Sequence, residues 1–176
     1  MPMVFLRFSG CNLRCPFCDT DFSGRRMMDA PSIIEEMTST LPHGVSSRGT
    51  RVCLTGGEPS LFIDEDLVGA LHREGFILHI ETNGTHPLPE GIDWVTLSPK
   101  SDFLEGGEGV PVLERADELK LVYTAQEDID RWLSFPARYH FLQPCSCKNT
   151  SQTVQYILHH PGWSLSLQTH KYLDIR

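Results

Sequence analysis

Three cysteines near the start of the chain could support redox chemistry. Cys11, Cys15 and Cys18 form a C-x3-C-x2-C set within one short segment. Thiolates are the usual ligands of iron–sulfur clusters, and four of them complete a cluster of the cubane type. Three thiolates leave one iron without a protein ligand, so that another molecule can bind there. The spacing therefore predicts a 4Fe-4S cluster with an open coordination site.

A zinc site is the alternative for these cysteines. Structural zinc takes four ligands, usually as two short pairs that are separated in the sequence. Cys145 and Cys147 could supply a second pair, although a gap of one residue is unusual for zinc. A third cysteine so close to the first two also fits a zinc finger poorly. Zinc therefore has a prior of roughly one in ten on ligand count.

Alternating strands and helices are expected to position these cysteines. Apolar, often β-branched runs predict strands at Val4–Phe8, Arg51–Thr55, Phe76–Glu81, Trp94–Ser98, Glu118–Val122, Tyr139–Gln143 and Trp163–Leu167. Helical patterns lie between them at Pro31–Ser39, Asp64–Glu74, Gln126–Ser134 and Ser151–His159. This order predicts an α/β fold with a mainly parallel sheet and helices outside it. Residues 99–111 are expected to form a surface excursion.

Polar motifs follow nearly every predicted strand. They are Ser9-Gly10-Cys11, Thr55–Pro59, Glu81–Gly84, Ser98–Lys100, Gln143-Pro144 and Gln168–Lys171. In parallel α/β folds, ligands bind at the carboxyl ends of the strands. These distant segments are therefore expected to converge on one rim, which would be an active site.

Length and composition limit the classes of protein to consider. The chain has 176 residues, 40% of them hydrophobic, which suits one domain with a core. Its formal net charge of −8 argues against a nucleic-acid partner. No apolar run approaches membrane-spanning length, and no signal-peptide pattern is present. The six cysteines are expected to be cytoplasmic thiols and cluster ligands, with Cys53 buried in an apolar run.

Several residues have two interpretations when they are considered alone. Gly56 and Gly57 could expose backbone groups to a ligand or could serve a tight turn. Thr20 could be a turn residue or an oxygen ligand of Mg²⁺. Arg7 could be a surface residue or the partner of a substrate carboxylate. His170 is about equally consistent with a surface position and with substrate contact.

Taken together, these segments resemble those of the 7-carboxy-7-deazaguanine synthases, within the radical S-adenosylmethionine (SAM) superfamily. The resemblance spans essentially the whole chain, and it rests on Val4–Thr20, Thr55–Pro59, Glu81–Thr85, Ser98–Lys100, Leu142–Pro144 and Leu167–Lys171. The cysteine set and the Thr-Gly-Gly-Glu-Pro motif identify only the superfamily. The ending Leu167–Lys171 is more specific, because radical SAM activating enzymes generally lack it.

The resemblance implies an incomplete TIM-like β/α barrel with a radical SAM core, acting as a homodimer. Such enzymes are carbon–nitrogen lyases that convert 6-carboxy-5,6,7,8-tetrahydropterin to 7-carboxy-7-deazaguanine in the queuosine pathway of tRNA modification. A 5'-deoxyadenosyl radical takes hydrogen from substrate C6, the ring contracts and ammonia leaves, while SAM is regenerated. Mg²⁺ orients the substrate, and a reductant such as flavodoxin or ferredoxin supplies the electron. No nucleic acid or membrane is implied as a partner.

The resemblance also implies roles for individual residues, with no catalytic side chain beyond the cluster and the SAM radical. Cys11, Cys15 and Cys18 would hold the 4Fe-4S cluster, and Thr20 would bind Mg²⁺. The residues implied to bind SAM are Phe17, Gly56, Gly57, Glu58, Glu81, Asn83, Ser98, Lys100 and Gln143. The residues implied to bind the substrate are Arg7, Thr55, Gly57, His170 and Arg176.

Relatives usually carry a further strand and a Gly-rich segment before the equivalent of Met3. Residues 1–176 are therefore expected to be one radical SAM domain that lacks an N-terminal strand. The Cys145-Ser146-Cys147 stretch could be incidental, redox-sensitive or a local family variation. A glycyl-radical activating enzyme is the alternative function, because it shares the cysteine spacing and the Thr55–Pro59 motif. A non-catalytic metal-binding module is a third hypothesis.

Overall fold

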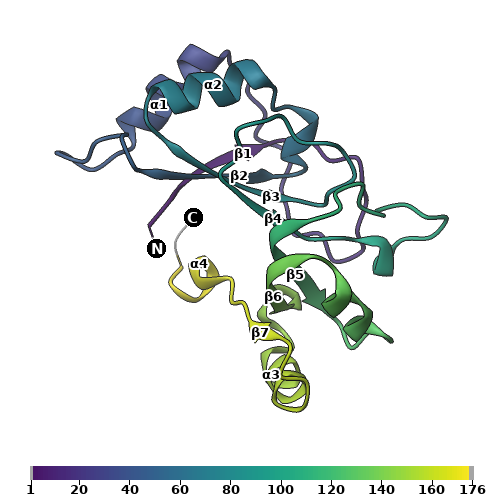
Figure 1. Cartoon of the computed structure of the whole chain (residues 1–176). Helices are drawn as coiled ribbons and strands as arrows, with labels where there is room; N and C mark the ends of the chain where they lie inside the picture. The colour runs from purple at the N-terminus through teal and green to yellow at the C-terminus, as the bar shows by residue number, and fades with distance from the viewer. Residues whose placement is uncertain (1, 175–176) are drawn as a thin grey trace.

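The computed structural model describes residues 2–174 as an α/β fold (Figure 1). Within these residues, one parallel sheet contains seven strands in their order along the chain. The strands are β1 (Val4–Phe8), β2 (Arg51–Gly56), β3 (Ile77–Thr82), β4 (Trp94–Leu97), β5 (Ala116–Tyr123), β6 (Ala137–Pro144) and β7 (Ser164–Leu165). In the described part of the chain β1 and β7 are not paired, so the barrel is incomplete. The predicted fold class is confirmed.

The helices begin at residues that can cap them. α1 (Ala30–Ser39) follows Asp29, whose side chain accepts a hydrogen bond from Ser32 N. α2 (Glu65–Arg73) follows Asp64 and carries two acidic residues in its first turn, where the helix dipole favours them. The other elements are α3 (Thr150–His159), α4 (Thr169–Tyr172) and the 3-10 turns η1 (Pro59–Leu61), η2 (Ser101–Phe103), η3 (Ile129–Ser134) and η4 (Cys145–Cys147). Among the helices of residues 2–174, none is both long and apolar enough to cross a membrane.

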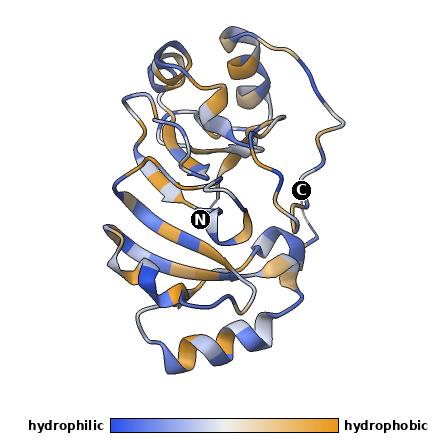
Figure 2. Ribbon diagram, turned by 90° about the vertical axis from the view of Figure 1, so that its right-hand side faces the viewer, coloured by the Kyte–Doolittle hydropathy of each residue, from blue (hydrophilic) through white to orange (hydrophobic). Residues whose placement is uncertain are grey.

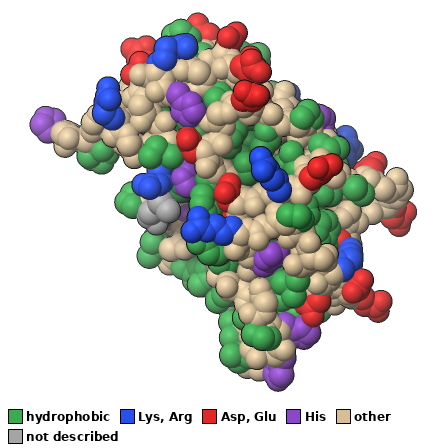
Figure 3. All heavy atoms as spheres, viewed as in Figure 1, with side chains coloured by type: hydrophobic (Ala, Val, Ile, Leu, Met, Phe, Trp, Pro, Cys, Tyr) green, Lys and Arg blue, Asp and Glu red, His purple; other side chains and the backbone are tan. Residues whose placement is uncertain are grey.

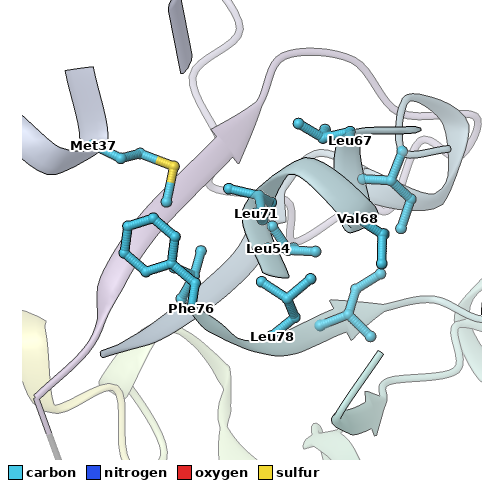
Figure 4. Close-up of a cluster of buried hydrophobic side chains, with 10 residues drawn as sticks. Met37, Leu54, Leu67, Val68, Leu71, Phe76 and Leu78 are labelled. Atoms are coloured by element: carbon cyan, nitrogen blue, oxygen red, sulfur yellow. The ribbon is translucent and has the colours of Figure 1, made fainter. Parts of the chain in front are cut away.

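Two clusters of apolar side chains lie on one face of the sheet. The first joins α1 and α2 to β2 and β3, and Figure 4 shows it around Met37, Leu54, Leu71 and Leu78. The second joins β4, β5 and β6 to η3, and it is formed by Leu97, Tyr123, Leu119, Leu121, Ile129, Leu142 and Trp163. Full burial of one such side chain contributes about 1.5–3 kcal/mol. This apolar face therefore holds the helices and the sheet together.

The opposite face of the sheet is polar near the carboxyl ends of the strands. The strand register pairs Arg7 with Thr55, and Glu81 with Thr96. Side chains alternate between the two faces along each strand, and Figure 2 shows this as alternating hydrophobic and hydrophilic residues. Lys120 of β5 reaches Glu81 of β3 across this face. The carboxyl half of the sheet thus presents charged and hydroxyl side chains on the side that the apolar clusters leave free.

The predicted helix at Gln126–Ser134 is wrong. The structure has only the 3-10 turn η3, which begins at Ile129. Ala125 and Asp128 both have positive φ angles, of 60° and 52°, and this conformation cannot continue into an α-helix. The apolar pattern was correct, since Ile129 is buried in the second cluster.

The end of the chain also differs from the prediction. The strand expected at Trp163–Leu167 is reduced to Ser164–Leu165, which pairs with Phe141 and Leu142 of β6. The polar residues after it form the short helix α4, which sequence patterns did not reveal. Four residues are too few for a helix to be stable alone. The position of α4 must therefore depend on side-chain contacts.

Candidate active site

The three cysteines lie on an irregular loop between the carboxyl end of β1 and α1, here called the cysteine loop (residues 9–29). Cys11 and Cys18 are exposed and Cys15 is half-buried, and all three are free thiols. Cys18 N donates a hydrogen bond to Cys15 O over 3.1 Å, and Leu13 N donates to Cys11 Sγ over 3.4 Å. These two contacts shape the backbone next to the thiols.

Burial affects two of the three loop thiols. It raises the pKa of Cys11 and Cys15, so a metal would have to displace their protons, as coordination does for thiols. Within residues 2–174, no group of three His, Cys, Asp or Glu side chains is arranged to hold one metal ion. Tetrahedral zinc needs its ligands around one ion, whereas a cluster binds separate thiolates through different irons.

Two glycines hold the end of β2 against the cysteine loop. Gly57 N donates a hydrogen bond to Phe8 O and Glu58 N donates one to Gly10 O, each over 2.8 Å. A Cβ atom on Gly57 would lie 1.9 Å from Gly10 O, and one on Gly56 would lie 2.3 Å from Phe8 O. Only glycine permits this approach, and Gly56 also has a φ of 115°. The glycines therefore have a structural role, whatever ligand they contact.

Glu58 joins the ends of β2 and β3. Its side chain is 1% exposed, and Oε1 accepts hydrogen bonds from Thr82 Oγ1 over 2.6 Å and from Ser60 N over 3.0 Å. Its Oε2 accepts from Asn83 N over 2.7 Å. A buried carboxylate is stable only with partners of this kind. Three protein donors thus already engage the carboxylate that was expected to bind SAM.

Asn83 continues this network to the cysteine loop. Its Nδ2 donates to Asn12 Oδ1 over 3.1 Å, and its Oδ1 accepts from Thr85 N and Oγ1. Asn12 Nδ2 in turn donates to Thr85 Oγ1 over 2.9 Å. The segment after β3 therefore fixes the loop directly beside Cys11.

A group of charged side chains lies on the polar face next to the loop. Lys120 Nζ donates to Glu81 Oε1 over 2.6 Å, and Lys120 is mostly buried. Burial alone would raise the pKa of the Glu81 carboxyl, but Lys120, and then Lys100 and Arg7, hold it below its usual value. Lys120 is therefore in direct contact with Glu81, while the charges of Lys100 and Arg7 act on the same carboxylate.

Lys100 lies between this group and the cysteine loop. Its Nζ donates to the backbone oxygen of Ser98 and, over 2.6 Å, to Ser98 Oγ. Burial lowers the pKa of Lys100 to about 8, against the opposing effect of the Cys15 thiolate. Phe103 of η2 packs edge-on against Phe17 with ring centroids 4.6 Å apart. Residues 98–103 thus form a wall of the cysteine site.

The C-terminal segment brings His170 to the same face. Burial, followed by the charges of Arg7 and Lys171, lowers the pKa of the His170 imidazole, so that it is neutral at pH 7. Gln168 Oε1 is a buried acceptor for which the described residues provide no hydrogen-bond partner. Arg176, which was expected to bind the substrate, lies outside the described residues.

The structure brings most of the predicted residues to one rim. Thr20 is half-buried on the cysteine loop, Gln143 is half-buried at the end of β6, and Thr55 is buried at the end of β2. Sequence reasoning missed Lys120, although a lysine inside the predicted strand Glu118–Val122 was a visible signal. It also missed the ion pair between Asp19 and Lys171, which no sequence pattern reveals.

Two hollows, of about 420 and 330 Å³, lie away from the rim and are lined by residues of α3 and by residues around Val112. Figure 3 shows acidic side chains over the α1 and α2 end of the molecule, and basic and acidic side chains side by side nearer the middle.

Comparison with known proteins agrees with this geometry. The model of the radical SAM superfamily matches residues 6–105. A curated relative from Bacteroides thetaiotaomicron, named 7-carboxy-7-deazaguanine synthase, is 51% identical over 99% of this chain and 88% of its own length. A relative of the same name from Bordetella pertussis is 42% identical over 98% of this chain and 89% of its own length. The crystal structure of QueE from Escherichia coli superposes with a TM-score of 0.69 at 27% identity, covering 93% of this chain and 84% of that one.

Proposed function

The chain belongs to the 7-carboxy-7-deazaguanine synthases of the radical SAM superfamily, and we propose that it converts 6-carboxy-5,6,7,8-tetrahydropterin to 7-carboxy-7-deazaguanine with loss of ammonia. One observation carries the substrate assignment. Lys120 contacts Glu81 on the polar face, and the charges of Lys100 and Arg7 act on the same carboxylate, in a chain whose net charge is −8. Local positive charge suits ligands that carry carboxylates, as both the pterin and SAM do.

The cysteine loop would hold the 4Fe-4S cluster through Cys11, Cys15 and Cys18. When both are bound, the cluster and SAM supply the 5'-deoxyadenosyl radical that takes hydrogen from C6 of the pterin. The protein itself binds and orients the two ligands and limits the access of water.

The residues of the polar face divide between the two ligands. We assign Lys100, Ser98, Asn83 and Glu81 to SAM, together with Phe17, Gly56, Gly57 and Gln143, because they lie at the strand ends next to the cysteine loop. Glu58 acts on SAM by holding Asn83 N, since its own carboxylate is engaged by protein donors.

The pterin is assigned to Arg7, Thr55, Gly57 and His170. Arg7 would bind the substrate carboxylate, and the neutral His170 imidazole can accept or donate a hydrogen bond to the pterin ring. Gln168 joins this group, because a ligand N–H could satisfy its buried Oε1.

Four further parts of the proposal concern conditions and partners. Thr20 Oγ1 is a hard oxygen that Mg²⁺ accepts together with substrate oxygens and water. The enzyme would work in the cytoplasm, because cluster thiolates need a reducing compartment. It would act as a homodimer and receive electrons from a flavodoxin or a ferredoxin.

The deciding experiment is an anaerobic assay of the cluster-reconstituted protein with the pterin, SAM, Mg²⁺ and a reductant. The mass of 7-carboxy-7-deazaguanine should appear without consumption of SAM. Cys15→Ser should abolish turnover, while the control Cys53→Ala, which removes a buried thiol of β2, should retain iron and activity. No product from protein with about four irons per chain would overturn the proposal.

The same assay separates the alternatives. A glycyl-radical activating enzyme would ignore the pterin and consume SAM only with a protein partner, and the names of the relatives do not favour it. A metal-binding module would contain metal without sulfide.

A further inference from the structure

Three segments that are distant in the sequence meet at one carboxylate on the cysteine loop. Asp19 Oδ2 accepts a hydrogen bond from Lys171 Nζ of α4, across 152 residues. It also accepts one from Ser146 Oγ of η4 over 3.3 Å. Asp19 directly follows Cys18, so the end of the cysteine loop is attached to the C-terminal segment.

A second contact holds the same helix. Tyr172 OH lies 3.0 Å from Thr150 Oγ1, at the start of α3. These two contacts fix α4 at adjacent residues, Lys171 and Tyr172. Other support is weak, because Leu167, Tyr172 and Leu173 are exposed and bury little apolar surface. A helix of four residues that lacks a buried face is held mainly by such polar contacts.

His170 lies within this tethered helix. His170 is half-buried and directly precedes Lys171 in α4, so the ion pair of Lys171 with Asp19 holds the imidazole toward the cysteine loop. Burial, and then the charge of Arg7, lowers the pKa of His170, which agrees with a position near the polar face. If α4 detaches, His170 leaves that face. The location of His170 thus depends on the conformation of the loop that carries Asp19.

We propose that Lys171 is a positioning residue for the synthase: its ion pair with Asp19 couples the fold of the cysteine loop to the placement of His170 in the substrate site. The substrate part of this inference rests on the proposed function, whereas the coupling between the loop and α4 does not. Ser146 Oγ also donates a hydrogen bond to Asp19, so the turn Cys145–Cys147 contacts the same carboxylate.

Local opening of α4 is the measurement that tests the coupling. Exposed ion pairs contribute little to global stability, but a weakly held segment can open on its own. Lys171→Met and Asp19→Asn should each raise hydrogen exchange of the amides of residues 169–173 by about two- to five-fold. The amides of residues 169–173 should exchange no faster in the double variant than in either single variant, and Lys171→Arg should keep wild-type protection. Lys148→Met is the matched control, because it removes an exposed cation from the adjacent turn.

Cluster removal provides the second arm. Chelating the iron from the wild-type protein should release the cysteine loop and raise exchange in residues 169–173 by a similar factor. In Lys171→Met, removal of the iron should not raise the exchange of these residues any further. Protection of α4 that does not change on cluster removal, or single-variant effects that simply add, would overturn the proposal.

Kinetics separate positioning from a direct contact of Lys171 with the substrate. Lys171→Met should raise KM for the pterin several-fold with little change in kcat, and Lys171→Arg should restore KM. If Lys171 binds substrate directly, KM rises while the exchange of residues 169–173 stays at the wild-type rate. Failure of the pterin assay alone would refute the proposed function but leave the exchange result intact.

Discussion

Replacing Glu58 with glutamine tests how the active-site ends of β2 and β3 are held together. The Glu58 carboxylate is 1% exposed and accepts three hydrogen bonds, from Ser60 N, Thr82 Oγ1 and Asn83 N. Glutamine keeps one acceptor oxygen, which can still serve Ser60 and Thr82. Its NH₂ group would face Asn83 N–H, so two buried donors would oppose each other.

The expected cost follows from these contacts. A hydrogen bond to a charged group contributes about 1.5–3 kcal/mol, and a buried donor without a partner costs about 1–3 kcal/mol. Glutamine carries no charge to desolvate, which offsets part of this loss. We expect Glu58→Gln to lower the free energy of unfolding by about 2 kcal/mol. With a typical slope near 2 kcal/mol per molar urea, the midpoint should fall by about 1 M.

The assay is urea unfolding of the metal-free protein under reducing conditions, followed by the fluorescence of its three tryptophans. Glu65→Gln, in the first turn of α2, is the matched control and should cost at most about 1 kcal/mol. SAM binding should also weaken in Glu58→Gln, through the loss of Asn83 positioning. An unchanged midpoint together with lost SAM affinity would refute this reasoning and make Glu58 a direct ligand.

Three other predictions follow from single residues. Gly57→Ala should lower the free energy of unfolding by more than about 3 kcal/mol in urea titrations, because its Cβ would lie 1.9 Å from Gly10 O. In the control Gly44→Ala the added Cβ meets no atom within 4 Å, so this variant should lose only about 1–2 kcal/mol for its left-handed backbone. Burial raises the pKa of Cys53 to about 12, so iodoacetamide at pH 8 should label the loop cysteines of the metal-free protein and spare Cys53. If mass spectrometry finds Cys53 modified as quickly as the loop cysteines, this prediction is wrong. Burial alone would raise the pKa of Asp130, but three side-chain donors hold this pKa below its usual value. The charged Asp130 therefore contributes to stability above about pH 4, and this contribution is lost as the pH falls through the folded-state pKa. The difference between the urea midpoints of wild type and Asp130→Asn should therefore be largest near pH 7 and shrink as the pH falls below about 4. A difference that stays constant with pH would argue against this linkage.

Local patterns in the sequence were sufficient for the order of the elements. The strand β1 was predicted with the bounds that the structure has, and α1 and α2 differ by one residue at their capped ends. These elements have strong periodicity and clear capping residues, which are local signals. The helix expected near Ile129 failed because positive φ angles at two neighbouring residues leave no trace in apolar periodicity.

The roles of polar residues depended on contacts that no local pattern contains. Glu58 belongs to a motif that indicates SAM binding, yet its carboxylate is engaged by donors up to 25 residues away. Lys120 was hidden in an apolar strand until the sheet register brought it to Glu81. The ion pair between Asp19 and Lys171 spans 152 positions of the sequence.

By itself, the sequence determined the α/β architecture of this protein and the radical SAM family to which it belongs. Cysteine spacing and apolar periodicity are properties of neighbouring residues, so they can be recognised without knowledge of the fold. Only the tertiary structure decided which side chains share the rim, which carboxylates are already engaged, and how the C-terminal helix is held near the cysteine loop. Those outcomes depend on strand register and long-range hydrogen bonds, which form only when segments distant in the chain pack together.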